Sequence, residues 1–521
     1  MNTSKVRKRC REHQFIINNI NVQDAEDIII AIFLRPIIRF GCFRRLFSAA
    51  AAGACLLLLF AFLSPPITTN QLLVVNTQDS AVECGSSRRI WKYYWDGNHQ
   101  INLYNGCSEA STNFIPAEAN TKPNRFLLVR TSGGLNQQRT GIIDSVVAAY
   151  ILSATLVVPN LDQESFWKDA SNFSDIFDMD WFTSYLSKDV RIVTRLPEEA
   201  SGRVATTRVP RKCDPSCYST RILPIFNRRK NVCMYVVQAV ELTKFDYRLA
   251  NQLDVDLQKL RCRVNYHALR FTDPIRKMGQ KLVEKMRMKS DHFVALHLRF
   301  EPDMLAFSGC YYGGGDEEIK ELSKLRKRWR TLHRKNPDKE RRNGKCPLSP
   351  EEVGLMLRAL GLGNDVHIYV ASGQIYGGEE ALAPLKALFP NFHTKETLAT
   401  GEELAQFSTY SSRMAALDFI VSDESDVFVA NNNGNMARML AGRRKYFGHK
   451  PTIRPNARRL SKLFLKVKNE NITWEEFALN VQKLQRGFMG EPGQINDNNN
   501  DAYKVDHQFH ENPLACICKN S

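Results

Sequence analysis

The sequence predicts an α/β protein with two lobes of alternating strands and helices, preceded by one transmembrane helix. Short β-branched apolar runs alternate with segments of helical spacing on both sides of about residue 275, which predicts the two lobes. An uncharged apolar run at 46–63 predicts the transmembrane helix. A chain of 521 residues is long enough for two such hydrophobic cores and for tails.

The apolar run at 46–63 is 18 residues long, which is the minimum expected for a membrane span. Basic residues cluster before it and few follow it, so we expect residues 1–45 to be a cytosolic tail. A cleaved signal peptide would not carry 45 residues before its apolar core. We therefore expect an uncleaved signal anchor, a stem at 64–122 and a luminal body. A buried helix of a soluble protein fits less well, because the run has no polar face.

The net charge of +17 favours an anionic partner. The basic stretch at 324–345 matches a nuclear or nucleic-acid motif, but no nucleic acid is expected on the luminal side of an anchor. A solvated helix and loop explains the stretch most simply. A surface for an acidic glycan is the second interpretation.

Ten of the 13 cysteines follow the predicted anchor, where disulfides persist. Cys213 and Cys217, with Cys233, suggest a disulfide or a core thiol rather than zinc, because no histidine lies near them. The tail at 486–521 is rich in Asn, Asp and Gly, so we expect it to be disordered. His507, His510, Cys516 and Cys518 in that tail are interpreted as incidental rather than as a metal site.

Two N-x-S/T sequons follow the anchor, at Asn172 and Asn471. A luminal body would be glycosylated at both sites.

The N-terminal lobe, 123–272, is expected to open with a strand at 126–129, a glycine turn and a helix at 140–154. A glycine turn before a helix lets backbone N–H groups approach a phosphate. The turn supplies the first candidate binding residues: Gly133, Gly134, Leu135 and Asn136. Taken alone, a short strand-to-helix loop without a ligand is an equally good interpretation.

The C-terminal lobe, 273–485, contains an apolar run at 293–298 that reads as a buried strand. His297, Arg299 and Glu301 occupy alternate positions at its end, so their side chains should share one side. An imidazole, a guanidinium and a carboxylate at a strand end are suitable for a phosphorylated ligand. A solvated Arg–Glu pair is the plainer alternative.

A third loop repeats the layout, with a strand at 426–430 and a helix at 436–442. It supplies Gly434, Asn435 and Met436. If the three loops face one another, they offer helix N-termini, one Arg and amide groups to a diphosphate. Transfer from a nucleotide sugar requires such a site, because the departing diphosphate is charged. No Asp-x-Asp turn suggests a metal, so we expect Arg299 to stabilise the diphosphate without one.

Four stretches together resemble the plant O-fucosyltransferase-like family, which is related to the protein O-fucosyltransferases and to pectin rhamnosyltransferases. They are 126–144 (FLLVRTSGGLNQQRTGIID), 292–315, 366–389 and 416–456, and the resemblance covers about 120–485. It implies a GT-B-like arrangement, with two Rossmann-like lobes facing across a cleft. It also implies inversion at the anomeric carbon, no metal or other cofactor, and a single-pass type II Golgi membrane protein.

The resemblance also implies roles for individual residues. Arg299 would contact the β-phosphate, with His297 and Leu298 beside it at the strand end. Gly133, Gly134, Leu135 and Asn136 would line the donor from the other lobe, and Asp418 would contact the nucleotide base. Gly434, Asn435 and Met436 would hold the phosphates.

The general base is not settled by the resemblance. Some protein O-fucosyltransferases carry a Glu in the first glycine loop, and this chain has none there. Glu301 is our candidate, because it shares a side with His297 and Arg299. Asp303 and Asp316 are the alternatives.

The leading hypothesis is a Golgi enzyme that transfers fucose from GDP-fucose to a glycan or protein acceptor. A UDP-rhamnose-dependent rhamnosyltransferase that extends rhamnogalacturonan is the second hypothesis. A non-catalytic glycan-binding protein of the same fold is the third. The sequence leaves the acceptor, the disulfide pairing and the oligomeric state open.

Overall fold

The computed structural model describes the chain from residue 104 onward with gaps: 104–164, 166–201, 204–227, 238–251, 253–329, 332, 335–448, 450–469, 472–490 and 513–519. These residues all belong to one unit, Cys84–Ser521. The predicted cytosolic tail (1–45), the anchor (46–63), most of the stem and Asn471 lie outside the described residues. Within the described ranges, no helix is long and apolar enough to cross a membrane.

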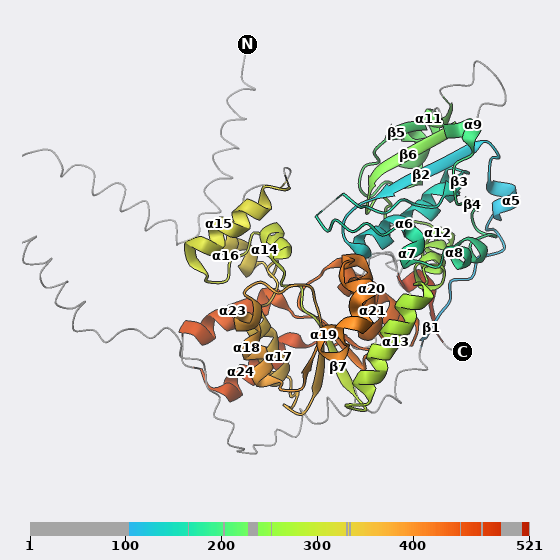
Figure 1. Cartoon of the computed structure of the whole chain (residues 1–521). Coiled ribbons are helices and arrows are strands. Elements are labelled where there is room, and N and C mark those ends of the chain that lie inside the picture. The colour runs from blue at the N-terminus through green and yellow to red at the C-terminus, as the bar shows by residue number, and fades with distance from the viewer. Residues whose placement is uncertain are drawn as a thin grey trace, which may run out of the picture. The chain divides into compact units, whose positions relative to one another are not determined.

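The first lobe is built on a five-stranded sheet in which every pairing is parallel (Figure 1). The strand order is β4-β3-β2-β6-β5. The strands are β2 (Arg125–Thr131), β3 (Thr155–Val157), β4 (Ile192–Val193), β5 (Val204–Thr207) and β6 (Gln238–Phe245). The helices of this half are α5 (Ala117–Asn120), α6 (Leu135–Ile151), α7 (Phe173–Ile176), α8 (Met179–Tyr185), α9 (Glu198–Ser201), α10 (Pro215–Arg221), α11 (Leu223–Asn227) and α12 (Val255–Cys262), the last continued by a π-helix at Arg263–Ala268.

The second lobe has a second five-stranded parallel sheet, in the order β11-β10-β7-β8-β9. Its strands are β7 (Phe293–His297), β8 (His367–Ala371), β9 (Phe392–His393), β10 (Val427–Ala430) and β11 (Thr452–Ile453). All residues of β7 and β10 are buried, as expected for strands covered on both faces. The α/β prediction with two parallel sheets is therefore confirmed.

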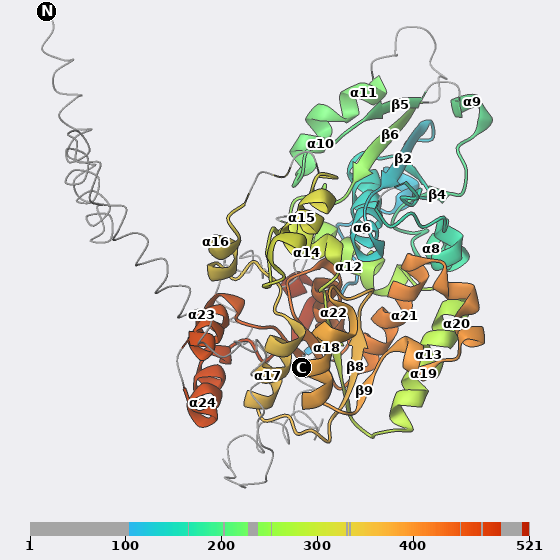
Figure 2. The same ribbon diagram turned by 60° about the vertical axis from the view of Figure 1, so that its left-hand side comes forward.

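The helices of the second half lie on both sides of this sheet (Figure 2). They are α13 (Asp273–Arg287), α14 (Pro302–Ser308), α15 (Gly315–Arg326), α16 (Pro337–Arg342), α17 (Pro350–Ala359), α18 (Gly378–Leu388), α19 (Lys395–Leu398), α20 (Gly401–Ser408), α21 (Ser411–Glu424), α22 (Asn435–Tyr446), α23 (Ala457–Asn469) and α24 (Trp474–Gln485). Ser349 caps α17 in a capping box: its hydroxyl accepts from the Glu352 N–H, and the Glu352 carboxylate accepts from the Ser349 N–H.

Strand order places the carboxyl ends of specific strands side by side. In the second sheet the order reverses between β7 and β10, and in the first sheet it reverses between β2 and β6. Ligands of open parallel sheets bind at such switch points, outside the carboxyl ends of the strands. The loops that follow β2, β7 and β10 are the three loops singled out from the sequence.

Helix α6 is buried on nearly every side, with 14 of its 17 residues inaccessible. Gly141 makes its close approach to the first sheet possible, because a Cβ there would overlap the carbonyl oxygen of Phe245.

We expect Gly141→Ala to lower the free energy of unfolding by about 1–3 kcal/mol, measured by urea denaturation. Gly401→Ala is the matched control, since a Cβ at Gly401 meets nothing within 4 Å. Equal stability of the two variants would contradict the packing argument.

The described C-terminal residues are ordered, which corrects part of the tail prediction. A 3-10 helix at Pro513–Cys516 leads into β12 (Ile517–Lys519), which pairs antiparallel with β1 (Tyr104–Gly106). Disulfides join Cys107 to Cys518 and Cys262 to Cys516. Disorder predicted for 486–521 is therefore wrong at 513–519, because cross-links supply an order that composition does not reveal. The same contacts bring the end of the predicted stem into the body.

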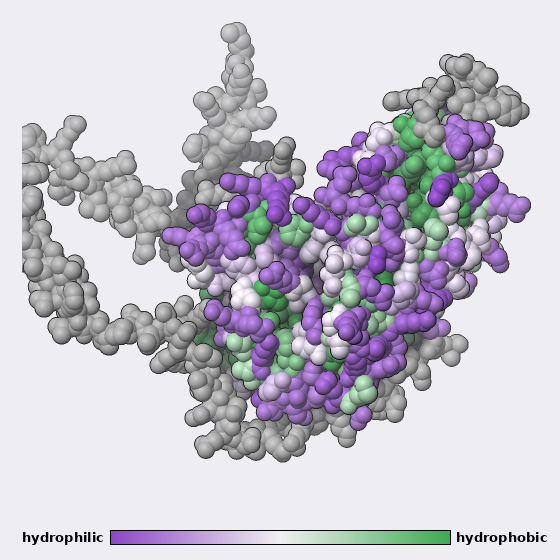
Figure 3. Space-filling view, viewed as in Figure 1, coloured by the Kyte–Doolittle hydropathy of each residue, from purple (hydrophilic) through white to green (hydrophobic). Residues whose placement is uncertain are grey.

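Two further disulfides join Cys213 to Cys217 and Cys310 to Cys346. The first agrees with the disulfide interpretation of Cys213 and Cys217. The second closes the segment that holds α15 and α16, whose surface is largely hydrophilic in Figure 3.

Candidate functional site

Arg299 lies two residues beyond β7, at the switch point of the second sheet. Its guanidinium donates to Glu301 Oε2 at 2.6 Å and to both carboxylate oxygens of Asp303, at 2.9 and 2.6 Å. Its backbone N–H donates to Asn431 Oδ1 at 2.8 Å, which ties the end of β7 to the loop after β10. The side chain is only 19% exposed. Burial lowers the pKa of Arg299, and the two carboxylates more than reverse this, so the guanidinium remains charged.

His297 is buried beside Arg299. Burial, together with the neighbouring Arg299 charge, lowers the pKa of His297 to about 3. The imidazole is therefore neutral at physiological pH, and Arg299 is the cation at this strand end. His297 Nδ1 is buried, and none of the described residues offers it a hydrogen-bond partner.

The glycine turn of the first lobe ends at the N-terminus of α6. Gly134 is the N-cap of this helix, and no side chain caps it. Gly133 has φ of +91°, and its N–H donates to Asp162 Oδ2 at 2.9 Å. The N–H groups of Leu135 and Asn136 have no acceptor within the helix, as in any first turn. This end of α6 is thus suited to an anion.

Helix α22 repeats this arrangement in the second lobe. Gly434 is its N-cap, again without a capping side chain, and the first turn begins with Asn435 and Met436. Asn435 Oδ1 accepts a hydrogen bond from the Tyr247 hydroxyl. Because Tyr247 follows β6, this bond joins the carboxyl edges of the two sheets.

Trp167 connects Arg299 to the glycine turn. The Arg299 guanidinium carbon lies 5.6 Å from the centroid of the Trp167 ring. A Cβ at Gly134 would lie 2.9 Å from Trp167 Nε1, so the indole packs directly on the turn. The structure therefore brings Gly134 and Arg299 against the same aromatic ring.

Asp418 lies on α21, below the carboxyl end of β8. Its carboxylate accepts from the Tyr369 hydroxyl at 2.7 Å and from Lys395 Nζ at 2.8 Å. Lys395 Nζ also donates to the carbonyl of Ser372, which follows β8. Burial raises the pKa of Asp418 to about 6, although Lys395 and Tyr369 act in the opposite direction. Asp418 is thus placed beside β8, which pairs with β7, the strand that leads to Arg299.

The sequence matches a family model described as GDP-fucose protein O-fucosyltransferase over residues 126–447. The chain belongs to this family. It is 62% identical over 438 residues to O-fucosyltransferase 6 of Arabidopsis thaliana, covering 84% of this chain and 74% of the relative. It is 58% identical over 489 residues to O-fucosyltransferase 16 of the same plant, covering 90% and 82%. The predicted family, and with it the assignment to the glycosyltransferases, is confirmed.

The chain is also similar to a relative that is named as a rhamnosyltransferase. Rhamnogalacturonan I rhamnosyltransferase 4 of Arabidopsis thaliana is 43% identical over 406 residues, covering 76% of this chain and 82% of its own. Among solved structures, POFUT1 in complex with GDP matches with a TM-score of 0.39 and 15% identity, covering 64% of this chain and 99% of that one. That likeness is too low to support any statement about the site.

In this O-fucosyltransferase-family protein, the candidate base Glu301 lies in contact with Arg299. Both of its oxygens are in use, Oε2 on Arg299 and Oε1 on the Gly373 N–H at 3.0 Å. Asp303 is engaged by Arg299 in the same way, and Asp316 is exposed in the first turn of α15. Glu301 and Asp303 therefore orient Arg299.

Sequence reasoning did not single out Tyr247 or Trp167. Tyr247 adopts φ of +48°, which is rare for a bulky side chain and is often found at functional sites. Neither residue belongs to a motif, because its position depends on contacts with distant segments. An aromatic side chain in the loop after β3 was the only signal available for Trp167.

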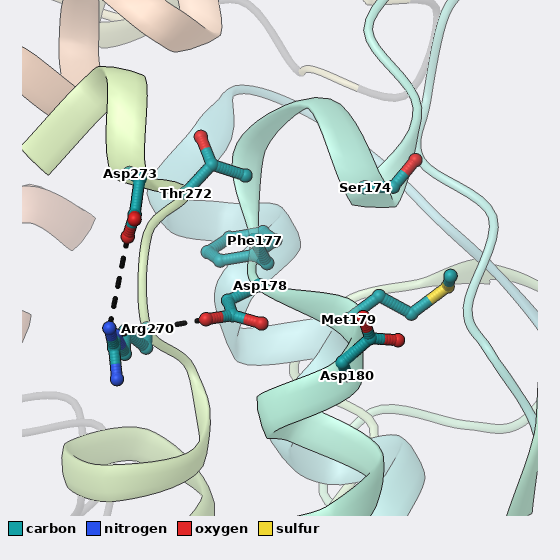
Figure 4. A pocket seen from close by; sticks show the side chains of 8 residues that line it. All are labelled: Ser174, Phe177, Asp178, Met179, Asp180, Arg270, Thr272 and Asp273. Carbon is teal, nitrogen blue, oxygen red and sulfur yellow. Dashed lines mark ion pairs between the residues drawn. The ribbon is translucent and has the colours of Figure 1, made fainter.

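One cavity of this protein is formed by residues outside the three site loops. It has a volume of about 390 Å³ and is lined by Ser174, Phe177, Asp178, Met179, Asp180, Arg270, Thr272 and Asp273 (Figure 4). Arg270 lies 3.8 Å from carboxylate oxygens of both Asp178 and Asp273. None of the predicted site residues lines this cavity. Across the described ranges, no group of three His, Cys, Asp or Glu side chains could hold a metal ion.

Asn172 is exposed at the N-cap of α7, where it is accessible for modification. Its glycosylation stays a prediction.

Proposed function

We propose that the protein is an inverting O-fucosyltransferase that uses GDP-fucose. The observation that carries this proposal is the position of Arg299, which two carboxylates fix at a switch point and which shares the Trp167 ring with the N-terminus of α6. A diphosphate beside Trp167 would meet a fixed cation and the first-turn N–H groups of α6 and α22. Family membership supports fucose as the sugar and GDP as the nucleotide.

In the proposed reaction, the bond between the anomeric carbon and the β-phosphate oxygen breaks, and GDP leaves with the electron pair. The acceptor oxygen bonds to the opposite face of the same carbon, and its proton passes to a water molecule. Arg299 and the helix N-termini stabilise the charge that develops on the leaving diphosphate. Held rigidly by Glu301 and Asp303, the guanidinium needs no reorganisation during this step. Neutral His297 adds no competing charge.

A donor comparison tests the proposal. We expect GDP to raise the thermal midpoint of the full-length chain more than UDP at the same concentration, because a ligand stabilises the folded state according to its affinity. A larger effect of UDP would overturn the GDP-fucose proposal. It would favour a UDP-rhamnose-dependent rhamnosyltransferase, which the 43% identity to a rhamnosyltransferase keeps as the second candidate.

Asp418 predicts a pH dependence of nucleotide affinity if its carboxylate receives the base. The folded-state pKa is about 6, so the carboxylate is ionised above that pH and protonated below it. We expect GDP affinity to fall as the pH drops through about 6, measured by calorimetric titration. His297 does not contribute in this window, since its pKa is about 3. The terminal phosphate of GDP also titrates at about pH 6. Asp418→Asn should therefore flatten the profile to the part that this phosphate contributes, and an unchanged pH dependence in that variant would exclude Asp418.

The proposed location is the Golgi lumen, with 46–63 as the anchor of a type II membrane protein. Four disulfides among the described residues support an oxidising compartment. A protease-protection assay on sealed vesicles tests the orientation, and digestion of the body in intact vesicles would contradict it.

Stabilisation of the leaving diphosphate by Arg299 needs no metal ion. We therefore expect EDTA to leave the rate of sugar transfer unchanged.

A further inference from the structure

A row of aromatic side chains leads from Arg299 toward the surface, and we call it the aromatic row: Trp167, Phe166, Trp329 and Phe307. Ring centroids are 5.1 Å apart for Phe166 and Trp167, 6.4 Å for Phe166 and Trp329, and 5.8 Å for Phe307 and Trp329. The row begins at the Arg299 guanidinium, 5.6 Å from the Trp167 ring. It therefore connects the proposed donor site to solvent.

The aromatic row crosses between the two lobes. Phe166 and Trp167 belong to the loop after β3, whereas Phe307 is on α14 and Trp329 follows α15. Phe166 is 37% exposed and Phe307 is 42% exposed. Large exposed aromatic residues that lie together usually mark a binding surface. The described residues in the row come from helices and loops, so no strand edge is presented there to a peptide backbone.

Cationic side chains lie on the aromatic row. The Arg328 guanidinium is 4.9 Å from the Phe166 centroid, and Lys335 Nζ is 5.7 Å from the Phe307 centroid. Both belong to the stretch 324–345, which holds eleven Lys or Arg and two Asp or Glu, so its charge is strongly positive. Arg326 and Arg341 of this stretch serve internal contacts, with the carbonyls of Ala306 and Phe307 and with Glu352. Lys335 is also engaged, because its Nζ donates to the Ser308 carbonyl at 3.2 Å and lies 3.7 Å from Glu340 Oε2. Arg328, by contrast, is exposed.

The segment that carries these cations is fixed at its base. The disulfide between Cys310 and Cys346 closes it, and Glu318 holds the loop before α15 by accepting from the N–H groups of Tyr312 and Gly314. A surface built on a closed segment loses little conformational entropy when a ligand binds.

We propose that the aromatic row and its cations form the acceptor subsite, and that it binds an acidic oligosaccharide containing uronic acid. Aromatic rings pack against the apolar C–H faces of sugar rings, and the exposed Arg328 attracts the carboxylates. The acceptor hydroxyl must approach the anomeric carbon beside Arg299, which is where the row begins. The proposal rests on the proposed transferase function and adds the chemical class of its acceptor.

The test measures glycan binding by the full-length chain in the absence of any donor. The probes are an oligomer of galacturonic acid and the fully methyl-esterified form of the same oligomer, which has the same backbone and no charge. We expect the acid to bind at least about tenfold more tightly than the ester, and we expect added salt to weaken it. Equal affinity for the two probes would overturn the proposal.

Three variants locate the binding surface. Arg328→Glu and Trp329→Ala should each weaken binding of the acid oligomer by about tenfold. Lys188→Glu makes the same change of charge at an exposed position of the first lobe and should leave affinity within about twofold. GDP affinity should be unchanged in all three, which shows that they are folded. Full oligomer affinity in Arg328→Glu and Trp329→Ala would overturn the assignment.

Two further outcomes separate this inference from the proposed function. A polyglutamate peptide that binds as tightly as the acid oligomer would overturn the glycan in favour of an acidic peptide. Normal GDP binding without oligomer binding would overturn the acceptor class alone. Absence of GDP binding in the unmodified chain would overturn the proposed function. The oligomer measurement uses no nucleotide, so the two results can be told apart.

Discussion

Arg299→Lys is expected to lower the rate of sugar transfer by about 10²–10³-fold while the protein stays folded. The substitution retains the positive charge at the end of β7. A lysine ammonium cannot bind Asp303 through two parallel hydrogen bonds, reach Glu301 and face a diphosphate at the same time. The expected loss therefore reports on fixed geometry rather than on charge. Transfer rates and thermal midpoints of both proteins are the measurement.

A matched control uses a second partly buried arginine. Arg358 on α17 donates to the carbonyl of Leu362, away from the three site loops, and Arg358→Lys should retain full activity. Arg299→Ala is a poorer test, because it leaves Glu301 and Asp303 buried without a cation and should cost about 3–5 kcal/mol of stability. An Arg299→Lys variant within about threefold of the unmodified rate would remove Arg299 from the mechanism.

Lys395→Met is expected to lower the free energy of unfolding by about 3–5 kcal/mol at neutral pH. Lys395 and Asp418 form a buried ion pair with side chains only 4% and 6% exposed. Removing Lys395 leaves the Asp418 carboxylate without its counter-charge, and burial then raises the pKa of Asp418 further. A urea denaturation series across pH is the measurement.

The sign of the pH effect follows from the raised pKa. A carboxyl group that binds its proton more tightly in the folded state favours folding at low pH, and this contribution is lost as pH rises through the folded-state pKa. The variant should therefore lose least stability in acid and most above about pH 6. Lys386→Met, which removes an exposed pair with Glu379, should change stability by at most about 0.5 kcal/mol. A loss in Lys395→Met that is independent of pH would contradict the explanation.

Two strands of the second sheet could be predicted because each is a short, continuous apolar run in the sequence. The run predicted at 293–298 is β7 (Phe293–His297), and the one predicted at 426–430 is β10 (Val427–Ala430). Helix α6 was predicted to start at residue 140 but begins at Leu135. Its first turn carries the polar residues Gln137 and Gln138, which bond to Asp246 and Thr131, so hydrophobic periodicity could not detect it.

The candidate site could be predicted only in part, because some of its contacts join residues that are far apart in the sequence. His297, Arg299 and Glu301 are neighbours in sequence, and their grouping follows from one strand end. Tyr247 meets Asn435, 188 positions away, through a contact that no local pattern encodes. The Arg299–Asp303 pair was also missed, because Asp303 was considered only as a base.

The pairing of β1 with β12 has a consequence for how the protein responds to proteolysis. The disulfide between Cys107 and Cys518 spans 411 positions. A single peptide-bond cleavage anywhere between these two cysteines therefore leaves both fragments covalently joined. On a denaturing gel, a nicked chain should migrate as one band until a reductant is added, and only then separate into two.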